Sequence, residues 1–116
     1  MSNEPGDSPV QAVRWQETIA IVDVAGDIDL NRSFDFQKSL LDVLEKQPQR
    51  IIVNLAQVPY MDSSGVASLV KLLSRTRKCG AQLYLVGLTK RVQSLFEITR
   101  LDVVFNICAT EKAALA

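Results

Sequence analysis

Short apolar runs alternate along this chain with longer segments of helical periodicity, and this alternation constrains the fold more than any other feature. Residues 50–55 and 81–86 are compact apolar runs, and a segment with apolar side chains at helical spacing follows each of them. Runs of this length suit strands that are buried on both faces. Strand and helix in repeated alternation require right-handed crossovers and a mainly parallel sheet. The sequence therefore predicts an α/β fold.

The start of the chain adds a hairpin to this pattern. Residues 18–25 form a β-branched run that ends at Gly26, and residues 10–16 before it alternate in the manner of an edge strand. We expect these two strands to pair. Residues 1–9 contain two prolines, a glycine and two acidic residues with nothing to bury, which predicts a flexible tail. The expected organisation is this tail followed by one domain over residues 10–116.

Three helices are expected, over residues 31–47, 64–78 and 89–99. Their apolar stripes are Phe36, Leu40, Val43 and Leu44 in the first, Val66, Leu69, Val70 and Leu73 in the second, and Val92, Leu95 and Phe96 in the third. Leu72 lies off the second stripe, so it is either a further core contact or part of a partner surface. A weak strand over residues 103–107 and a helical turn from Thr110 complete the chain.

Charge and composition argue against several functions. Thirteen basic residues balance thirteen acidic ones, which removes the electrostatic attraction that binders of nucleic acid rely on. The chain has no histidine and only two cysteines, so neither a transition-metal site nor histidine-based catalysis is expected. Cys79 and Cys108 have no short-spaced motif and are predicted to be reduced thiols in or near the core, with a disulfide as the minority alternative.

The sequence gives no sign of export, membrane insertion or cofactor binding. Its first residues are polar and acidic, unlike a secretory signal, and no apolar run approaches the ~20 residues of a membrane-spanning helix. A glycine-rich phosphate loop of the GxxxxGK type is absent as well. We therefore expect a soluble, cytoplasmic protein without a cofactor.

Two loops that follow strands have unusual polar residues. One is Gly26-Asp27-Ile28-Asp29, and the other, over residues 56–65, ends in Asp62-Ser63-Ser64-Gly65. Sites in open α/β sheets gather at the carboxyl ends of strands, so these loops lie side by side if their strands are neighbours. At least one residue of the second loop should then cap the helix that follows.

On local evidence, Asp62 or Ser63 is simply this helix cap, because aspartate and serine are the usual caps. Gly65 argues that this segment has a role beyond capping. A glycine inside the first turn costs up to about 1 kcal/mol relative to alanine, so it requires a reason such as the close approach of another backbone or of a partner.

Together these residues resemble the domain shared by sulfate transporters and anti-sigma factor antagonists, known as STAS, in its free-standing bacterial form. The resemblance runs from about residue 10 to residue 113 and includes residues 26–29, 51–55, 60–65 and 92–96. The hydrophobic-Asp-Ser-Ser-Gly element combined with the upstream glycine-acidic loop is specific. Two positions depart from the usual pattern, since Ala67 and Arg100 stand where the family often has glycine; the second leaves open how the late helix ends.

The resemblance implies an anti-sigma factor antagonist. In proteins of this kind, the first serine of the Asp-Ser-Ser-Gly element, here Ser63, is phosphorylated by a serine kinase that is also the anti-sigma factor, and a PP2C-type phosphatase removes the phosphate. The unphosphorylated form would bind the kinase and free the sigma factor. The chain itself would be a monomer without enzymatic activity. The partner-binding residues implied are Asp27, Asp29, Asp62, Ser63, Ser64 and Gly65.

Two other functions are weighed against this one. The domain could instead be an accessory subunit of a transporter or of a sensory complex, and neighbouring genes would distinguish the two cases. An enzyme with Ser63 as nucleophile and Asp62 as base is disfavoured, because adjacent residues at a helix start rarely face each other and no histidine or obvious lysine base accompanies them.

The basic residues between Lys71 and Lys78 are predicted to form a solvated face that complements the helix dipole.

Overall fold

The sheet is assembled in the order of the sequence. The computed structural model describes residues 8–116, and its five strands follow one another as β1-β2-β3-β4-β5. Strands β1 (Val10–Gln16) and β2 (Ile19–Ala25) form an antiparallel hairpin. Strands β3 (Arg50–Gln57), β4 (Gln82–Val86) and β5 (Asn106–Cys108) continue the sheet in parallel from β2. The predicted α/β fold with a mainly parallel sheet and an opening hairpin is confirmed.

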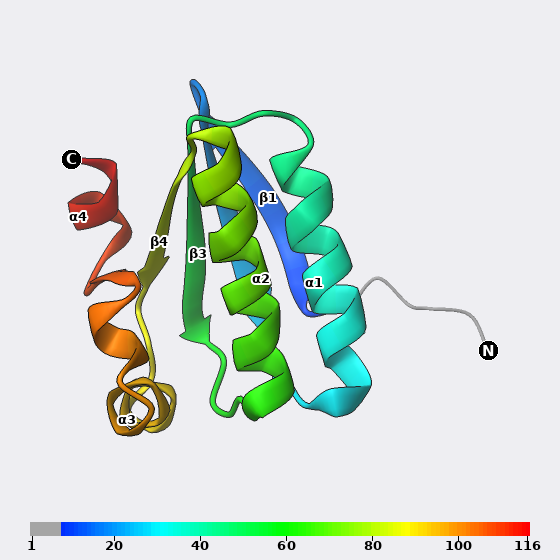
Figure 1. Cartoon of the computed structure of the whole chain (residues 1–116), viewed down its shortest axis with the longest axis vertical. Helices are drawn as coiled ribbons and strands as arrows, with labels where there is room; N and C mark the ends of the chain where they lie inside the picture. The colour runs from blue at the N-terminus through cyan, green and yellow to red at the C-terminus, as the bar shows by residue number, and fades with distance from the viewer. Residues whose placement is uncertain (1–7) are drawn as a thin grey trace.

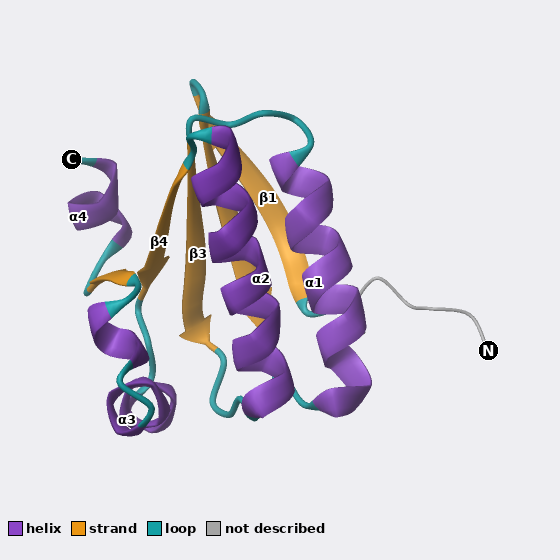
Figure 2. Ribbon diagram, viewed as in Figure 1, coloured by secondary structure: helices purple, strands orange, loops and turns teal. Residues whose placement is uncertain are grey.

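The helices cover the two faces of the sheet unequally. Helices α1 (Leu30–Leu44) and α2 (Ser63–Cys79) lie side by side on one face, as Figures 1 and 2 show. The short helix α4 (Glu111–Leu115) packs on the opposite face. Helix α3 (Lys90–Ile98) lies at the lower end of Figure 1 and leads through a 3₁₀ turn, Leu101–Val103, into β5. The fold is thus a two-layer structure with a small cover on its second face.

Alternate residues of the central strands feed two separate apolar clusters. Val22 and Val53 point toward α1 and α2, whereas their neighbours Ile21 and Ile52 join Ala114 of α4 on the other side. Burial on both faces explains why the strand sequences are apolar without interruption. The large cluster under the two long helices holds most of the buried side chains.

The apolar stripe of α2 is rotated from its predicted position. Leu72 is fully buried, so of the two alternatives it is a core contact, while Val70 is 42% exposed and does not belong to the stripe. The neighbouring helix explains the rotation. Ser68, one turn before Leu72, donates a hydrogen bond to the carbonyl of Ser33 in α1, so this side of α2 is covered by α1.

The strand predicted over residues 103–107 is wrong in position. Arg100 takes a left-handed conformation with φ 63°, which ends α3 and starts the 3₁₀ turn in place of a strand. Phe105 then turns into the core, where its ring lies 5.4 Å from that of Phe96 with edge-to-face geometry. Only residues 106–108 pair with β4. The predicted helical turn from Thr110 is confirmed, since Thr110 caps α4.

The cysteines and the chain start also differ in part from expectation. Both thiols are free, but Cys79 is exposed at the last residue of α2, where the helix has left the core, and Cys108 is half-buried. Residues 1–7 of the expected tail lie outside the described residues. Pro9 is buried, and its carbonyl accepts a hydrogen bond from the Ala25 N–H at 2.9 Å. Within residues 8–116, no helix combines the length and hydropathy needed to cross a membrane.

Candidate functional site

The loops that leave β2 and β3 meet at the carboxyl end of the sheet. Ile28 and Met61 pair as a parallel bridge between the loops. The Ile28 N–H donates to the Tyr60 carbonyl at 3.0 Å, and the Asp62 N–H donates to the Ile28 carbonyl at 3.1 Å. The expected juxtaposition of the two polar loops is therefore confirmed, and backbone hydrogen bonds hold it.

Each of the two loops ends in an aspartate that caps a helix. The Asp29 carboxylate accepts hydrogen bonds from the N–H groups of the second and third residues of α1, at 3.0 and 3.2 Å. The Asp62 carboxylate does the same for α2, at 2.9 and 3.4 Å. Both caps satisfy N–H groups that a helix start otherwise leaves unpaired. Of the two residues that the sequence offered as the cap of α2, Asp62 is the one that caps.

The two serines after Asp62 have different environments. Ser64 is half-buried, and its hydroxyl donates to the Asp62 carboxylate at 2.5 Å. Ser63, the first residue of α2, is exposed, and its hydroxyl makes no hydrogen bond with any residue between 8 and 116. Among the described residues, the Ser63 hydroxyl is therefore open to solvent, whereas the Ser64 hydroxyl is held by Asp62.

The environment of Asp62 favours its ionised form. The hydrogen bond from the Ser64 hydroxyl is the main cause that lowers the pKa of Asp62, and partial burial opposes it. Backbone N–H groups of Ser64, Gly65 and Leu30 lower this pKa further. Asp62 is therefore a carboxylate at neutral pH. The contribution of Leu30, the first residue of α1, ties the starts of the two helices to one carboxylate.

Gly65 is buried where the two loops press against each other. A Cβ atom on this residue would lie 2.6 Å from Cγ of Met61 and 2.8 Å from Cγ2 of Ile28, which is closer than real carbon contacts allow. The close approach of the loop from β2 thus accounts for this glycine. Contact with a partner is not needed to explain it.

The six predicted site residues occupy two adjoining turns of the chain. Asp27 and Ser63 are exposed, Asp29, Asp62 and Ser64 are half-buried, and Gly65 is buried. The loop before α1 is fixed from within, since Arg32 donates to the carbonyl of Asp27 at 2.8 Å. The exposed members are thus one carboxylate, on the loop before α1, and one hydroxyl, on the residue after the ionised cap of α2.

Comparison with known proteins assigns this arrangement to a family. The family model of the STAS domain matches residues 11–114. The chain belongs to the STAS domain family. The anti-sigma-B factor antagonist of Staphylococcus aureus is 30% identical over 92 residues, which are 79% of this chain and 85% of that protein. The protein of the same name from Staphylococcus epidermidis is 30% identical over 86 residues, covering 74% and 80% of the two chains.

Solved structures show the same STAS fold. A Thermotoga maritima protein described as an anti-sigma factor antagonist superposes with a TM-score of 0.85 at 22% identity, over 90% of each chain. The phosphorylated form of the Bacillus protein SpoIIAA gives a TM-score of 0.69 at 17% identity, over 90% of this chain and 95% of that one. The resemblance stated from the sequence is confirmed.

Two apolar side chains beside the site received no role from the sequence pattern. Leu30 and Phe34 lie on the first turns of α1 and are 75% and 73% exposed. The available signal was their position off the apolar stripe of α1, directly after a polar loop. Leu30 directly follows the Asp29 cap of α1, and Phe34 lies one turn further along the same helix.

The start of α3 supports the site from the other side. The Thr89 hydroxyl donates to the carbonyl of Val58 at 2.8 Å, and the Arg91 guanidinium lies over the Tyr60 ring at 5.2 Å from its centre. Both contacts hold the segment between β3 and Asp62. Two neighbouring strand-to-helix loops of the STAS domain thus contact the segment that leads from β3 to Asp62.

A surface hollow lies at the opposite end of the helices. Its volume is about 980 Å³, and residues at the C-terminal ends of α1 and α2 line it, among them Leu41, Asp42, Arg75 and Lys78. It shares no residue with the predicted site. Within residues 8–116, no group of three or more His, Cys, Asp or Glu side chains is positioned to hold a metal ion.

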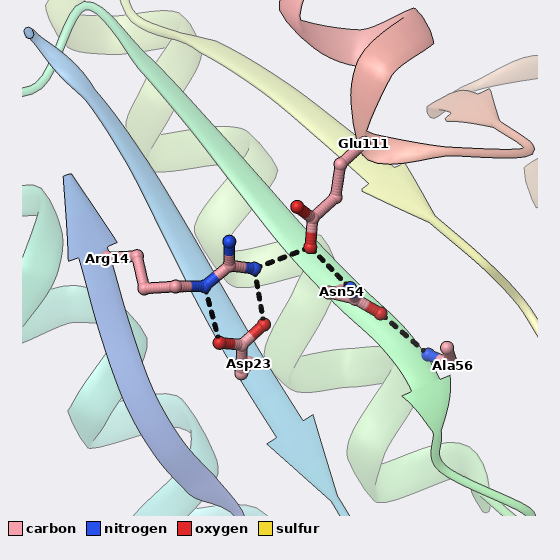
Figure 3. Close-up of polar contacts among 5 residues, drawn as sticks. All are labelled: Arg14, Asp23, Asn54, Ala56 and Glu111. Carbon is pink, nitrogen blue, oxygen red and sulfur yellow. Dashed lines mark hydrogen bonds and ion pairs between the residues drawn. The ribbon is translucent and has the colours of Figure 1, made fainter. Parts of the chain in front are cut away.

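A polar network on the second face of the sheet escaped the sequence pattern altogether. Arg14 of β1 forms ion pairs with Asp23 of β2 at 2.7 Å and with Glu111 of α4 at 2.5 Å (Figure 3). Asn54 donates to Glu111 at 2.6 Å and accepts from the Ala56 N–H at 2.9 Å. The hydrogen bonds to Asp23 and then to Glu111 raise the pKa of Arg14, and Arg14 is the main cause that lowers the pKa of Glu111. The network fixes α4 to the end of β3 that leads toward Ser63.

Proposed function

We propose that this STAS domain is an anti-sigma factor antagonist whose unphosphorylated form binds an anti-sigma serine kinase and releases the sigma factor. Phosphorylation of Ser63 abolishes this binding, and a PP2C-type phosphatase restores it. The observation behind the proposal is the contrast between the exposed, unbonded Ser63 hydroxyl and the Ser64 hydroxyl held by Asp62. The names of the staphylococcal relatives support the class of function, and SpoIIAA, which has this fold, occurs in a phosphorylated form.

The fold tolerates a phosphate at this position. A phosphoserine adds about −1.5 to −2 charge, and a helix N-terminus favours such a charge by about 0.3 to 1 kcal/mol. The cap of α2 is already made by Asp62, so modification of Ser63 leaves the capping hydrogen bonds in place. Phosphorylation therefore has no reason to unfold the start of α2.

The same phosphate opposes docking of a partner. It adds its charge next to the ionised Asp62 and the exposed Asp27, and a partner surface must remove water from all three groups. Repulsion between like charges and the removal of water from them at a contact surface together cost roughly several kcal/mol. A hundredfold loss of affinity requires only about 2.7 kcal/mol. Disruption of an interface is thus sufficient for switching without any large refolding.

The proposed role leaves catalysis to the partner. Asp62 is the acidic side chain adjacent to Ser63 in sequence, but its carboxylate receives the Ser64 hydroxyl and backbone N–H groups instead. Ser63 therefore lacks the hydrogen-bonded base that an activated nucleophile requires. Ser63 is an acceptor of phosphate from a kinase, and the proposed function requires a cytoplasmic location.

Phosphate mapping tests the proposal. The purified protein is incubated with ATP and each serine-kinase anti-sigma factor encoded in the same genome, and the phosphorylated residue is identified by mass spectrometry. We expect phosphate on Ser63, complete loss in Ser63→Ala, and retention in the matched control Ser64→Ala. Phosphate on another residue, or incorporation by Ser63→Ala equal to that of the wild type, contradicts the proposal.

A further inference from the structure

Leu30 and Phe34 form a continuous apolar patch on the outer surface of α1. They lie four residues apart, which stacks them on one side of the helix. With about three quarters of each side chain exposed, neither contributes to the core, whereas Phe36 and Leu40 of the same helix are fully buried. Single exposed apolar residues are ordinary, but an adjacent leucine and phenylalanine form a patch that the stability of the domain does not explain. We name Leu30 and Phe34 the α1 patch.

The α1 patch lies on the first turns of α1, the part of the helix that packs beside the start of α2. Leu30 is the first residue after the Asp29 cap, and its backbone N–H also acts on the Asp62 carboxylate. One turn further along, the Ser68 hydroxyl of α2 donates to the Ser33 carbonyl of α1 at 3.2 Å. The first turns of the two helices thus form one surface at the lower end of Figure 1. A partner that covers Ser63 from the α1 side also meets the α1 patch.

We propose that the α1 patch is the apolar anchor by which this chain holds its anti-sigma partner, with Ser63 beside it as the switch. This inference rests on the proposed function. The partner's matching surface is an apolar pocket bordered by basic residues, because the exposed Asp27 and the ionised Asp62 flank the same end of the two helices. Large apolar anchors seated in a pocket provide most of the affinity of such interfaces, and charges at the rim provide orientation.

The anchor and the switch have separate roles. The α1 patch contributes affinity in either phosphorylation state because it contains no group that is modified. Ser63 adds a penalty only when it holds a phosphate. Loss of the anchor should therefore weaken binding and slow phosphorylation of Ser63 by the bound kinase, while the ability of the remaining complex to respond to phosphate is kept.

The test compares two double variants, each of which replaces two exposed apolar side chains by alanine. Leu30→Ala/Phe34→Ala removes the α1 patch, and Ile98→Ala/Val103→Ala removes two apolar side chains that are 80% and 79% exposed beyond β4. Affinity for the anti-sigma kinase that binds the wild type is measured by calorimetry, after thermal unfolding has verified each fold. We expect about 10- to 100-fold weaker binding for the first variant and less than about threefold for the second. Phe34→Lys, a single exposed change, should also weaken binding with an unchanged unfolding temperature.

The outcomes separate the inference from the proposed function. Wild-type affinity in Leu30→Ala/Phe34→Ala, alongside lost binding in Ser63→Asp, overturns the anchor and leaves the proposed function standing. An equal loss in both double variants also overturns it. If the wild type binds none of the anti-sigma kinases, the proposed function fails. Self-association of the wild type in sedimentation, abolished by Phe34→Lys without any effect on kinase binding, would assign the α1 patch to a second copy of the chain and overturn the anchor as well.

Discussion

Helices α1 and α2 start in almost the same way and present different chemistry to solvent. Asp29 and Asp62 cap them with nearly identical backbone angles, φ −107° and ψ −175° against φ −102° and ψ −172°. The first helical residue is exposed in both, but it is Leu30 in α1 and Ser63 in α2. The cap therefore stabilises each helix without specifying a function. The proposed function depends on Ser63, the residue that the cap of α2 positions next.

The third helical residue separates the two starts further. In α1 it is Arg32, whose guanidinium returns to the carbonyl of Asp27. In α2 it is Gly65, whose missing side chain leaves room for Ile28 and Met61. The start of α1 is thus fixed by its own side chain, whereas the start of α2 is fixed by the neighbouring loop. Three predictions test this difference and a fourth tests the opposite face of the sheet, in order of the size of the expected effect.

The largest effect is expected for Gly65→Val, which fills the contact between the two helix starts. The added atoms collide with Ile28 and Met61, and overpacking of this kind costs about 3 kcal/mol in the free energy of unfolding. Ala67→Val on the exposed side of the same helix is the matched control and should change it by less than about 0.5 kcal/mol. Urea denaturation measures both. Similar midpoints for the two variants would show that the loops do not press together at Gly65.

The two caps should differ in strength. Asp62→Ala removes the acceptor of two helix N–H groups and of the Ser64 hydroxyl, and we expect a loss of about 2 kcal/mol. Asp29→Ala should cost about 1 kcal/mol, near the middle of the range for a simple cap. Asparagine at either position keeps most of the cap and serves as the control. Equal losses for the two alanine variants would remove the distinction between the helix starts.

Acid should weaken the start of α2 through Asp62. The folded state holds the pKa of this carboxyl below its ordinary value of 3.8, so the unfolded chain takes up the proton first as the pH falls. The stability that Asp62 contributes is complete above that value and is lost as the pH drops through the lowered folded pKa. Asp62→Asn should flatten the acid limb of the unfolding curve between about pH 5 and pH 2. An unchanged limb would mean that the carboxylate is not stabilised as described.

The smallest effect is expected from the opposite face of the sheet. Glu111→Gln weakens the contact with Arg14, and because this pair is partly exposed the cost should be about 0.5 kcal/mol. Amide hydrogen exchange in α4 should accelerate, while exchange at the starts of α1 and α2 stays the same. Faster exchange at Ser63 or Ser64 would show that the network on the second face also supports the site.

The sequence predicted those features that depend on neighbouring residues. The order of strands and helices, the meeting of the two loops and the presence of a cap all follow from local periodicity and from the parallel topology. The reason for Gly65 was foreseen as one of two possibilities, and the close approach of a loop is the one observed. The prediction of a strand over residues 103–107 was wrong in position because Arg100 adopts a left-handed conformation and starts a 3₁₀ turn. No pattern of apolar residues encodes this conformation.

Other features depend on tertiary geometry alone. The exposure of Phe34 and the burial of Leu72 are set by how α1 and α2 are rotated against each other and the sheet. The contact between Arg14 and Glu111 joins residues 97 positions apart, so it exists only once α4 has folded back on the sheet. The Ser64 hydroxyl reaches the Asp62 carboxylate, whereas the Ser63 hydroxyl has no hydrogen-bond partner within residues 8–116, and this difference exists only in the folded helix start.

The most direct test of the central claim is a comparison of affinity for the anti-sigma kinase before and after modification of Ser63. The fully phosphorylated and unphosphorylated proteins are titrated separately by calorimetry, with Ser63→Ala as the form that cannot be modified. We expect the phosphorylated protein to bind at least about 100-fold more weakly, which corresponds to about 2.7 kcal/mol, and Ser63→Ala to bind like the unphosphorylated wild type. Equal affinity of the phosphorylated and unphosphorylated proteins would contradict the assignment of Ser63 as the switch.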